Sequence, residues 1–115
     1  MTTYSKDILA LHQLEKAISL FFDEEDYICA ITLAGAAEDI CRGILERESK
    51  ETSVDKLKAW LEEKHPEAPE LKRFYVHANE IRNSLKHFTD ATESSVEIDK
   101  EEAVYWLNRA VMNYD

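Results

Sequence analysis

Arg82, Asn83 and His87 are three polar side chains that could act together on a phosphate group. They lie in the stretch NEIRNSLKHF at positions 79–88. A histidine can exchange a proton near neutral pH, and an arginine can stabilise the charge that develops on a phosphate. Asn83 could hydrogen-bond the phosphate or orient the histidine. Because RNA supplies its own nucleophile, the 2′-hydroxyl, such a site would need no metal and no other cofactor.

One straight helix cannot bring Arg82 and His87 together. Side chains five residues apart on a helix point about 140° away from each other. A twofold dimer could instead gather two arginines and two histidines in one cleft, so a working site predicts a symmetric homodimer. The alternative is that Asn79, Asn83 and His87 only line the solvated face of an amphipathic helix.

Composition favours an all-α protein. The chain has 115 residues but only two glycines and two prolines, and a β-rich fold of this size would need more turn residues. Its net charge is -10, which argues against non-specific binding of nucleic acid. An acidic surface is better suited to a basic protein partner.

Apolar residues recur at three- and four-residue steps in five segments, as is typical of amphipathic helices. We expect a single domain, residues 1–115, that forms a four- to five-helix bundle. The expected helices span about 4–22, 26–48, 52–64, 69–88 and 99–114. Two spacings predict capping boxes at helix starts, Thr52 with Asp55 and Asp99 with Glu102. The expected inward-facing residues are Ile8, Leu11, Leu14, Ile18, Phe21, Val54, Leu57, Trp60, Leu61, Phe74, Ala78, Ile81, Leu85, Phe88, Ala103, Leu107, Ala110, Val111 and Tyr114.

The second expected helix is apolar around most of its circumference, which predicts a central and buried position. Its stretch AGAA at 34–37 carries little side-chain bulk. Gly35 costs about 1 kcal/mol relative to alanine in a helix. We therefore expect this glycine to permit a close approach by a neighbouring helix.

Residues Arg82 to His87 resemble the R-N-x-x-x-H form of the R-x4-6-H motif of HEPN domains (higher eukaryotes and prokaryotes nucleotide-binding). The setting is similar, because the motif stands late in a helical chain, before a final helix. AITLAGAAEDI at 30–40 also resembles the second helix of some small bacterial proteins of this kind. The resemblance implies an all-α, HEPN-like fold, and often a dimer with the two motifs face to face. Arg82 and His87 would then be the catalytic pair, with Asn83 as a supporting polar residue.

The resemblance leaves two functions open. Many HEPN domains are metal-independent ribonucleases in toxin–antitoxin or phage-defence systems, whereas others bind or scaffold without activity. This chain has Thr89 where several toxin members have a tyrosine. It could be a homodimeric endoribonuclease, or a non-catalytic module that dimerises, binds a nucleotide or pairs with a cognate protein.

Glu38 is a second charged residue of interest. It stands four residues before Arg42, and this spacing predicts a salt bridge along one helix. The alternative is that Glu38 points into the cleft beside Arg82 or His87.

Metal binding and membrane insertion are not expected. His77 and Glu80 have the spacing of two metal ligands on one helix, but no further ligand set accompanies them. Cys29 and Cys41 would lie roughly 18 Å apart on one helix, too far for a disulfide, and we expect reduced, core-facing thiols in a cytoplasmic protein. No apolar run is long enough to span a membrane, and the stretch MTTYSKDILALHQLEKA lacks the hydrophobic region of a signal peptide.

Overall fold

Five helices make up the described part of the chain, which covers residues 1–64, 69–85 and 95–114 of a computed structural model. No strand occurs among these residues, so the all-α prediction is confirmed. None of the described helices is both long and apolar enough to cross a membrane. The helices are α1 (Lys6–Asp23), α2 (Tyr27–Arg47), α3 (Ser53–Lys64), α4 (Pro69–Ser84) and α5 (Lys100–Tyr114).

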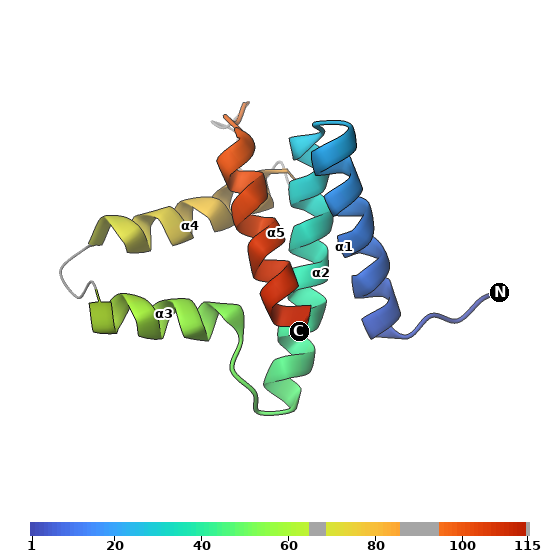
Figure 1. Cartoon of the computed structure of the whole chain (residues 1–115), viewed down its shortest axis with the longest axis horizontal. Helices are drawn as coiled ribbons and strands as arrows, with labels where there is room; N and C mark the ends of the chain where they lie inside the picture. The colour runs from blue at the N-terminus through green and yellow to red at the C-terminus, as the bar shows by residue number, and fades with distance from the viewer. Residues whose placement is uncertain (65–68, 86–94, 115) are drawn as a thin grey trace.

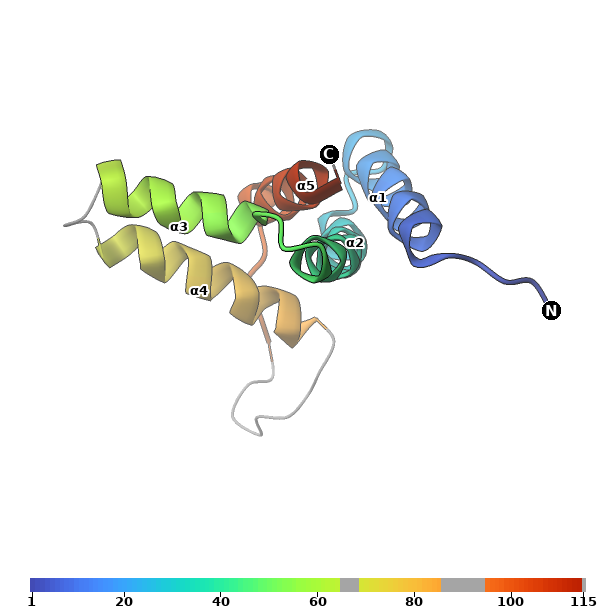
Figure 2. The same ribbon diagram turned by 90° about the horizontal axis from the view of Figure 1, so that it is seen from below.

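Helix α2 occupies the centre of the fold, as its apolar circumference predicts. It packs between α1 and α5, and these two helices also contact each other (Figure 1). Helices α3 and α4 extend side by side away from these three (Figures 1 and 2). Helix α3 contacts α5, whereas α4 contacts both α2 and α5. The last turn of α4, which carries Arg82, therefore reaches the junction of α2 and α5.

Alanine dominates the core between α1, α2 and α5. Small side chains let helix axes approach closely, so that backbone and side-chain atoms pack at high density. The bulkiest fully buried side chain is Trp106 of α5, which fills the space that the alanines leave. The fully buried alanines are Ala10, Ala17, Ala30, Ala34, Ala37, Ala103 and Ala110.

Small residues also explain where the predicted inner faces are wrong. Ile8 and Ile18 of α1 and Val111 and Tyr114 of α5 are exposed. The prediction followed the largest apolar residues, but the buried stripes are centred on alanines. The true faces are therefore rotated, and these four large residues lie at their margins. The buried apolar residues are Ala10, Leu14, Ala17, Leu20 and Phe21 in α1, and Ala103, Trp106, Leu107 and Ala110 in α5.

Only the beginning of helix α3 is buried. Val54 is buried and Leu57 half-buried, but Trp60, predicted to face inward, is exposed. This follows from the way α3 extends beyond α5 (Figure 2). On α4, the predicted burial of Ala78 and Ile81 is confirmed. The side chains of Leu61 and Phe74, and the residue Phe88, lie outside the described part.

The two cysteines differ in their surroundings. Both are free thiols, and Cys41 is buried as predicted, but Cys29 is exposed. Cys29 is in the first turn of α2, where Asp26 caps the helix by accepting a hydrogen bond from the Cys29 backbone N–H at 3.1 Å. Ile28 beside it is also exposed, whereas Ala30 is fully buried, so Cys29 lies on the outward side of this turn.

Both predicted capping boxes are confirmed. The Asp55 backbone N–H donates to Thr52 Oγ1 at 3.1 Å, and the Thr52 N–H donates to Asp55 Oδ2 at 3.1 Å. The Asp99 N–H donates to Glu102 Oε2, also at 3.1 Å. These bonds satisfy backbone donors that have no partner within the helix.

Replacing Thr52 by alanine should lower the free energy of unfolding by about 1 kcal/mol, because the hydroxyl cap is lost. Hydrogen bonds from the Thr52 backbone and hydroxyl hold the pKa of the Asp55 carboxyl below its usual value. The carboxylate part of the cap is thus present at neutral pH and is lost as the pH falls through this lowered pKa. Urea titrations of the parent and of Thr52→Ala should differ most at neutral pH and less in acid, where the Thr52 hydroxyl still accepts from the Asp55 N–H. Thr52→Ser keeps the hydroxyl, and a loss of stability equal to that of alanine would contradict this role.

Candidate functional site

Arg82 lies inside the fold and not on its surface. Only 7% of the residue is exposed. Its guanidinium carbon is 5.1 Å from the centre of the Trp106 ring, within the range of a cation–π contact. Arg82 therefore packs its charged group against α5, although Asn83, the next residue along α4, is exposed.

Gly35 of α2 makes room for this arginine. A Cβ atom at position 35 would lie 2.5 Å from Nε and 2.7 Å from Cδ of Arg82. A Cβ atom essentially never lies within 3.0 Å of such an atom, so Arg82 would have to shift. The close packing predicted for this glycine is confirmed, but the group that approaches it is an arginine side chain and not a helix backbone.

Asp39, one turn beyond Gly35 on α2, forms an ion pair with Nη2 of Arg82. Its other oxygen accepts a hydrogen bond from Nη2 of Arg42 at 2.6 Å. The Asp39 side chain is 38% exposed, so the ion pair lies at the edge of the core. Burial lowers the pKa of the Arg82 guanidinium, with the Glu38 carboxylate opposing this shift and the Arg109 cation adding to it.

Glu38 is fully buried and holds the largest group of polar contacts at this junction. Its Oε1 accepts hydrogen bonds from Nη2 of Arg109 at 2.8 Å, from Nδ2 of Asn113 at 3.2 Å and from Nε of Arg42 at 3.2 Å. Among the described residues, its Oε2 has no hydrogen-bond partner. The predicted salt bridge to Arg42 is confirmed. The alternative, that Glu38 points into a cleft beside Arg82 or His87, stays a prediction.

Arg109 and Asn113 are the polar residues that the sequence analysis missed. Both are buried in α5, and both bind Glu38. The guanidinium carbon of Arg109 lies 4.4 Å from the centre of the Trp106 ring. A signal was available, because Asn113 continues the three- and four-residue spacing of Trp106 and Ala110. Polar residues within an apolar stripe indicate a buried polar contact.

Two of the three predicted site residues lie in the described part of the chain, and they face different ways. Arg82 points into the core, whereas Asn83, the next residue along α4, is exposed. His87 lies outside the described residues, as do Lys86 and Thr89. The composite site of Arg82, Asn83 and His87 therefore remains a prediction.

The other histidines form no site in the described part of the chain. His77 Nδ1 lies 3.9 Å from Glu80 Oε2, and both side chains are exposed. No group of three or more potential metal ligands occurs among the described residues. His12 is exposed on α1, and His65 is outside the described part.

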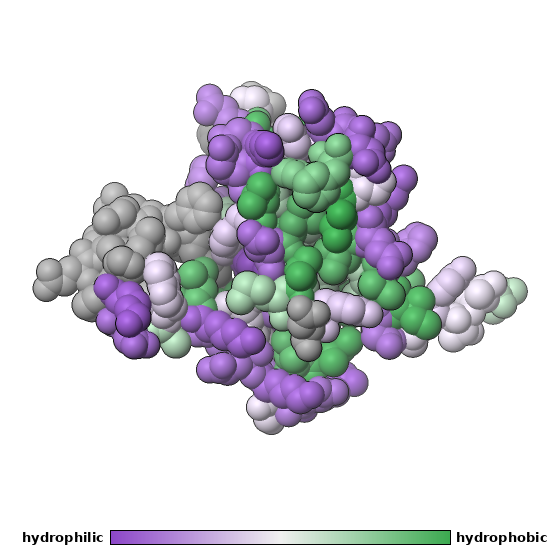
Figure 3. All heavy atoms as spheres, in the orientation of Figure 1, coloured by the Kyte–Doolittle hydropathy of each residue, from purple (hydrophilic) through white to green (hydrophobic). Residues whose placement is uncertain are grey.

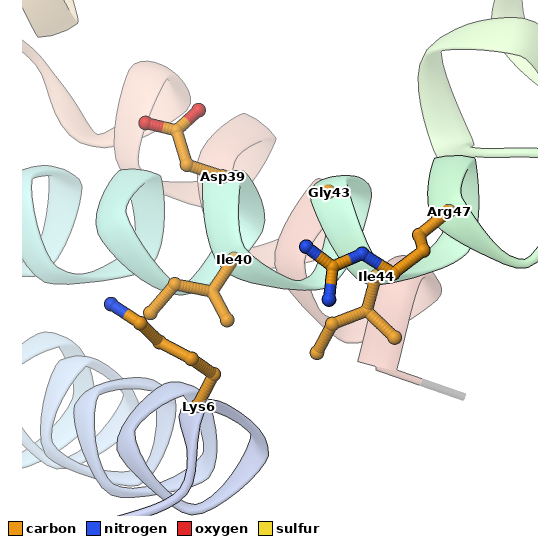
Figure 4. A pocket seen from close by; sticks show the side chains of 6 residues that line it. All are labelled: Lys6, Asp39, Ile40, Gly43, Ile44 and Arg47. Atoms are coloured by element: carbon orange, nitrogen blue, oxygen red, sulfur yellow. The ribbon is translucent and has the colours of Figure 1, made fainter.

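A shallow groove of about 360 Å³ begins beside the Arg82–Asp39 pair. Figure 4 shows Lys6 of α1 facing Ile40 of α2, with Arg47 further along the same helix. The floor is apolar, and the amino and guanidinium groups could contact an anion. Asp39 belongs to both the lining and the ion pair with Arg82, and Figure 4 shows its carboxylate pointing away from Lys6. The lining residues are Lys6, Asp39, Ile40, Gly43, Ile44 and Arg47.

Comparisons with protein-family models, curated proteins and solved structures found no match to this chain. The geometry at the α2–α4–α5 junction is therefore what indicates the function. There, the described residues hold a motif arginine in an internal network of ion pairs.

Replacing Gly35 by alanine should destabilise the protein, although alanine favours helix. The new methyl group must displace Arg82 from both Asp39 and Trp106, and overpacking of this kind costs about 1–3 kcal/mol. Gly43 is the matched control on the same helix, because nothing lies within 4 Å of its Cβ position. Gly43→Ala should stabilise the protein by up to about 1 kcal/mol.

Thermal or urea unfolding of the two variants checks this contrast. The double variant Gly35→Ala, Arg82→Ala should be no less stable than Arg82→Ala alone, because the clash is removed. If Gly35→Ala proves as stable as Gly43→Ala, Arg82 does not occupy the space beside Gly35.

Proposed function

We propose that this chain is a HEPN-like helical module that binds a protein partner and does not cleave RNA. The position of Arg82 carries this proposal. A catalytic arginine must contact the phosphate as charge develops on it. Arg82 instead contacts Asp39 and Trp106 and is almost completely buried. Its charge serves to join α4 to α2 and α5.

The overall charge supports the same conclusion. RNA would have to approach a protein of net charge -10, and electrostatic attraction to phosphates normally drives such an approach. An exposed free thiol at Cys29 fits a protein of the reducing cytoplasm. A basic cognate protein is one class of partner that this surface would attract.

A second copy of this chain is the partner that we propose first. Large apolar side chains on α1 and α5 are exposed, among them Phe22, which is 71% exposed, with Ile8, Val104 and Val111. Figure 3 shows hydrophobic surface across α5 and α1 on one face of the molecule. Contiguous apolar surface of this kind marks protein interfaces, and homodimers form the more apolar ones.

Ribonuclease activity is the second candidate, and one observation favours it. The Arg82–Asp39 pair reaches the surface through the half-exposed carboxylate of Asp39. Asn83, the residue after Arg82, is also exposed. A phosphate could then replace Asp39 as the partner of Arg82. In this case Arg82 and His87 would be catalytic, with two copies sharing the acid and base roles.

An RNA cleavage assay at neutral pH with EDTA separates the two functions. The binding module predicts no cleavage by the parent protein. Arg82→Ala should lower the melting temperature, because Asp39 loses its buried partner; breaking such a pair costs about 3–5 kcal/mol when fully buried and less at this edge. His87→Ala is the matched change within the same motif. Cleavage that leaves a 2′,3′-cyclic phosphate, and that His87→Ala abolishes without changing the melting temperature, would establish the ribonuclease instead.

Light scattering after size exclusion tests the dimer separately. We expect the parent to elute at twice the mass of one chain, and Phe22→Glu with Val111→Glu to yield monomers that keep their helical circular dichroism. Charges placed in an apolar interface must be desolvated on association. Glu15→Gln, a change at an exposed position of α1 that adds no charge, is the control and should stay dimeric. A parent that is monomeric at all concentrations would contradict the proposed dimer.

A further inference from the structure

A second, more apolar groove lies between α3 and α5, and no part of the proposed function uses it. Its volume is about 450 Å³, within the range of pockets that bind small organic molecules. Leu57 and Trp60 of α3 form one side, and Tyr105 and Met112 of α5 form the other. Trp60 and Met112 are both exposed, so a ligand could bury apolar surface on each wall.

The polar groups of this groove are cationic or neutral. Lys56 and Arg109 line it, and no aspartate or glutamate does among the described residues. This is unusual in a chain with 24 acidic residues against 14 basic ones. The local charge therefore favours an anion where the rest of the surface repels one.

Two arginines are buried in the interior behind the groove. Arg82 is paired with Asp39, and Arg109 is paired with Glu38. The Arg109 cation acts to lower the pKa of Arg82, which reflects their mutual repulsion. An anion placed next to Arg109 would offset this repulsion.

The Ser53 hydroxyl could donate a hydrogen bond to a ligand in the groove. Ser53 lines the groove and is 4% exposed, and its Oγ has no hydrogen-bond partner among the described residues. Buried hydroxyls normally have a partner, because an unsatisfied one costs free energy. Its backbone N–H is already bonded to Asn113 Oδ1 at 2.6 Å, which fixes the position of the residue.

We propose that the α3–α5 groove binds a small organic acid with an aromatic body. The carboxylate would lie near Ser53, Lys56 and Arg109, and the ring would pack between Trp60 and Met112. Aromatic walls favour a planar apolar group, and the exposed Lys56 favours a group that carries a negative charge. This site is separate from the Arg82–Asp39 pair and from the α1 and α5 surface proposed for the dimer.

Calorimetric titration with naphthalene-2-carboxylate tests the proposal on the full chain. The control ligand, naphthalene-2-methanol, has the same ring system without the charge. We expect the acid to bind at least about fivefold more tightly than the alcohol, which is about 1 kcal/mol. Equal affinity would contradict the role of charge, and no measurable binding of the acid would overturn the site.

Matched variants locate the binding. Lys56→Glu should lower the affinity for the acid about tenfold or more. Lys58→Glu, the same charge reversal two residues along α3 and outside the lining, should change this affinity little. Met112→Glu should also abolish binding, whereas Ile28→Glu, an equally exposed apolar position on α2, should not. Equal effects within either pair would mean that the acid binds elsewhere. Circular dichroism of all four variants excludes loss of fold as the cause.

Discussion

The buried carboxylate of Glu38 is the constraint on which the rest of the structure depends. An isolated charge in a protein interior is very unfavourable, so it must be paired and hydrogen-bonded where it lies. Glu38 obtains these partners from Arg42 of its own helix and from Arg109 and Asn113 of α5. If α2 packed against α5 in another register, Glu38 would lose Arg109 and Asn113. Polar contacts of this kind can specify one arrangement where alanine packing alone would allow several.

The same network extends to the two outer helices. Asn113 accepts a hydrogen bond from the backbone of Ser53, which fixes the beginning of α3. Arg82 reaches Asp39, next to Glu38, and this contact fixes the end of α4. The indole N–H of Trp106 donates to the Ala78 carbonyl at 3.2 Å, a second link between α4 and α5. A short polar segment of α2 thus positions α3, α4 and α5.

Much of this fold could be predicted from local patterns, because helix caps and apolar periodicity act within a few residues. The starts of α3 and α5 followed from Thr52 and Asp99. The packing faces were less predictable, since Ala10 and Ala17 are central while Ile8 is exposed. Sequence spacing gives the direction of a side chain around its own helix, but which direction is inward depends on neighbours that are distant in the chain.

The candidate site shows the same limit more strongly. Spacing predicts that Arg82 and His87 point apart around the helix axis, but it could not reveal that Gly35 and Trp106 receive the arginine. These three residues lie on three different helices, α2, α4 and α5, and no pattern within one helix shows that they meet. This contact changes the interpretation of the motif, because a buried and paired arginine contributes to the fold whether or not the chain acts on RNA.

Nuclear magnetic resonance of the arginine side chains tests this account most directly. If Arg82 is held by Asp39 and Trp106, its Nε–H should give a resolved signal that exchanges slowly with water at neutral pH. That signal should also show nuclear Overhauser contacts to the Trp106 ring and to the Gly35 Hα atoms. An Arg82 signal that exchanges rapidly, like those of surface arginines, with no contact to Trp106 would contradict the internal position on which the account depends.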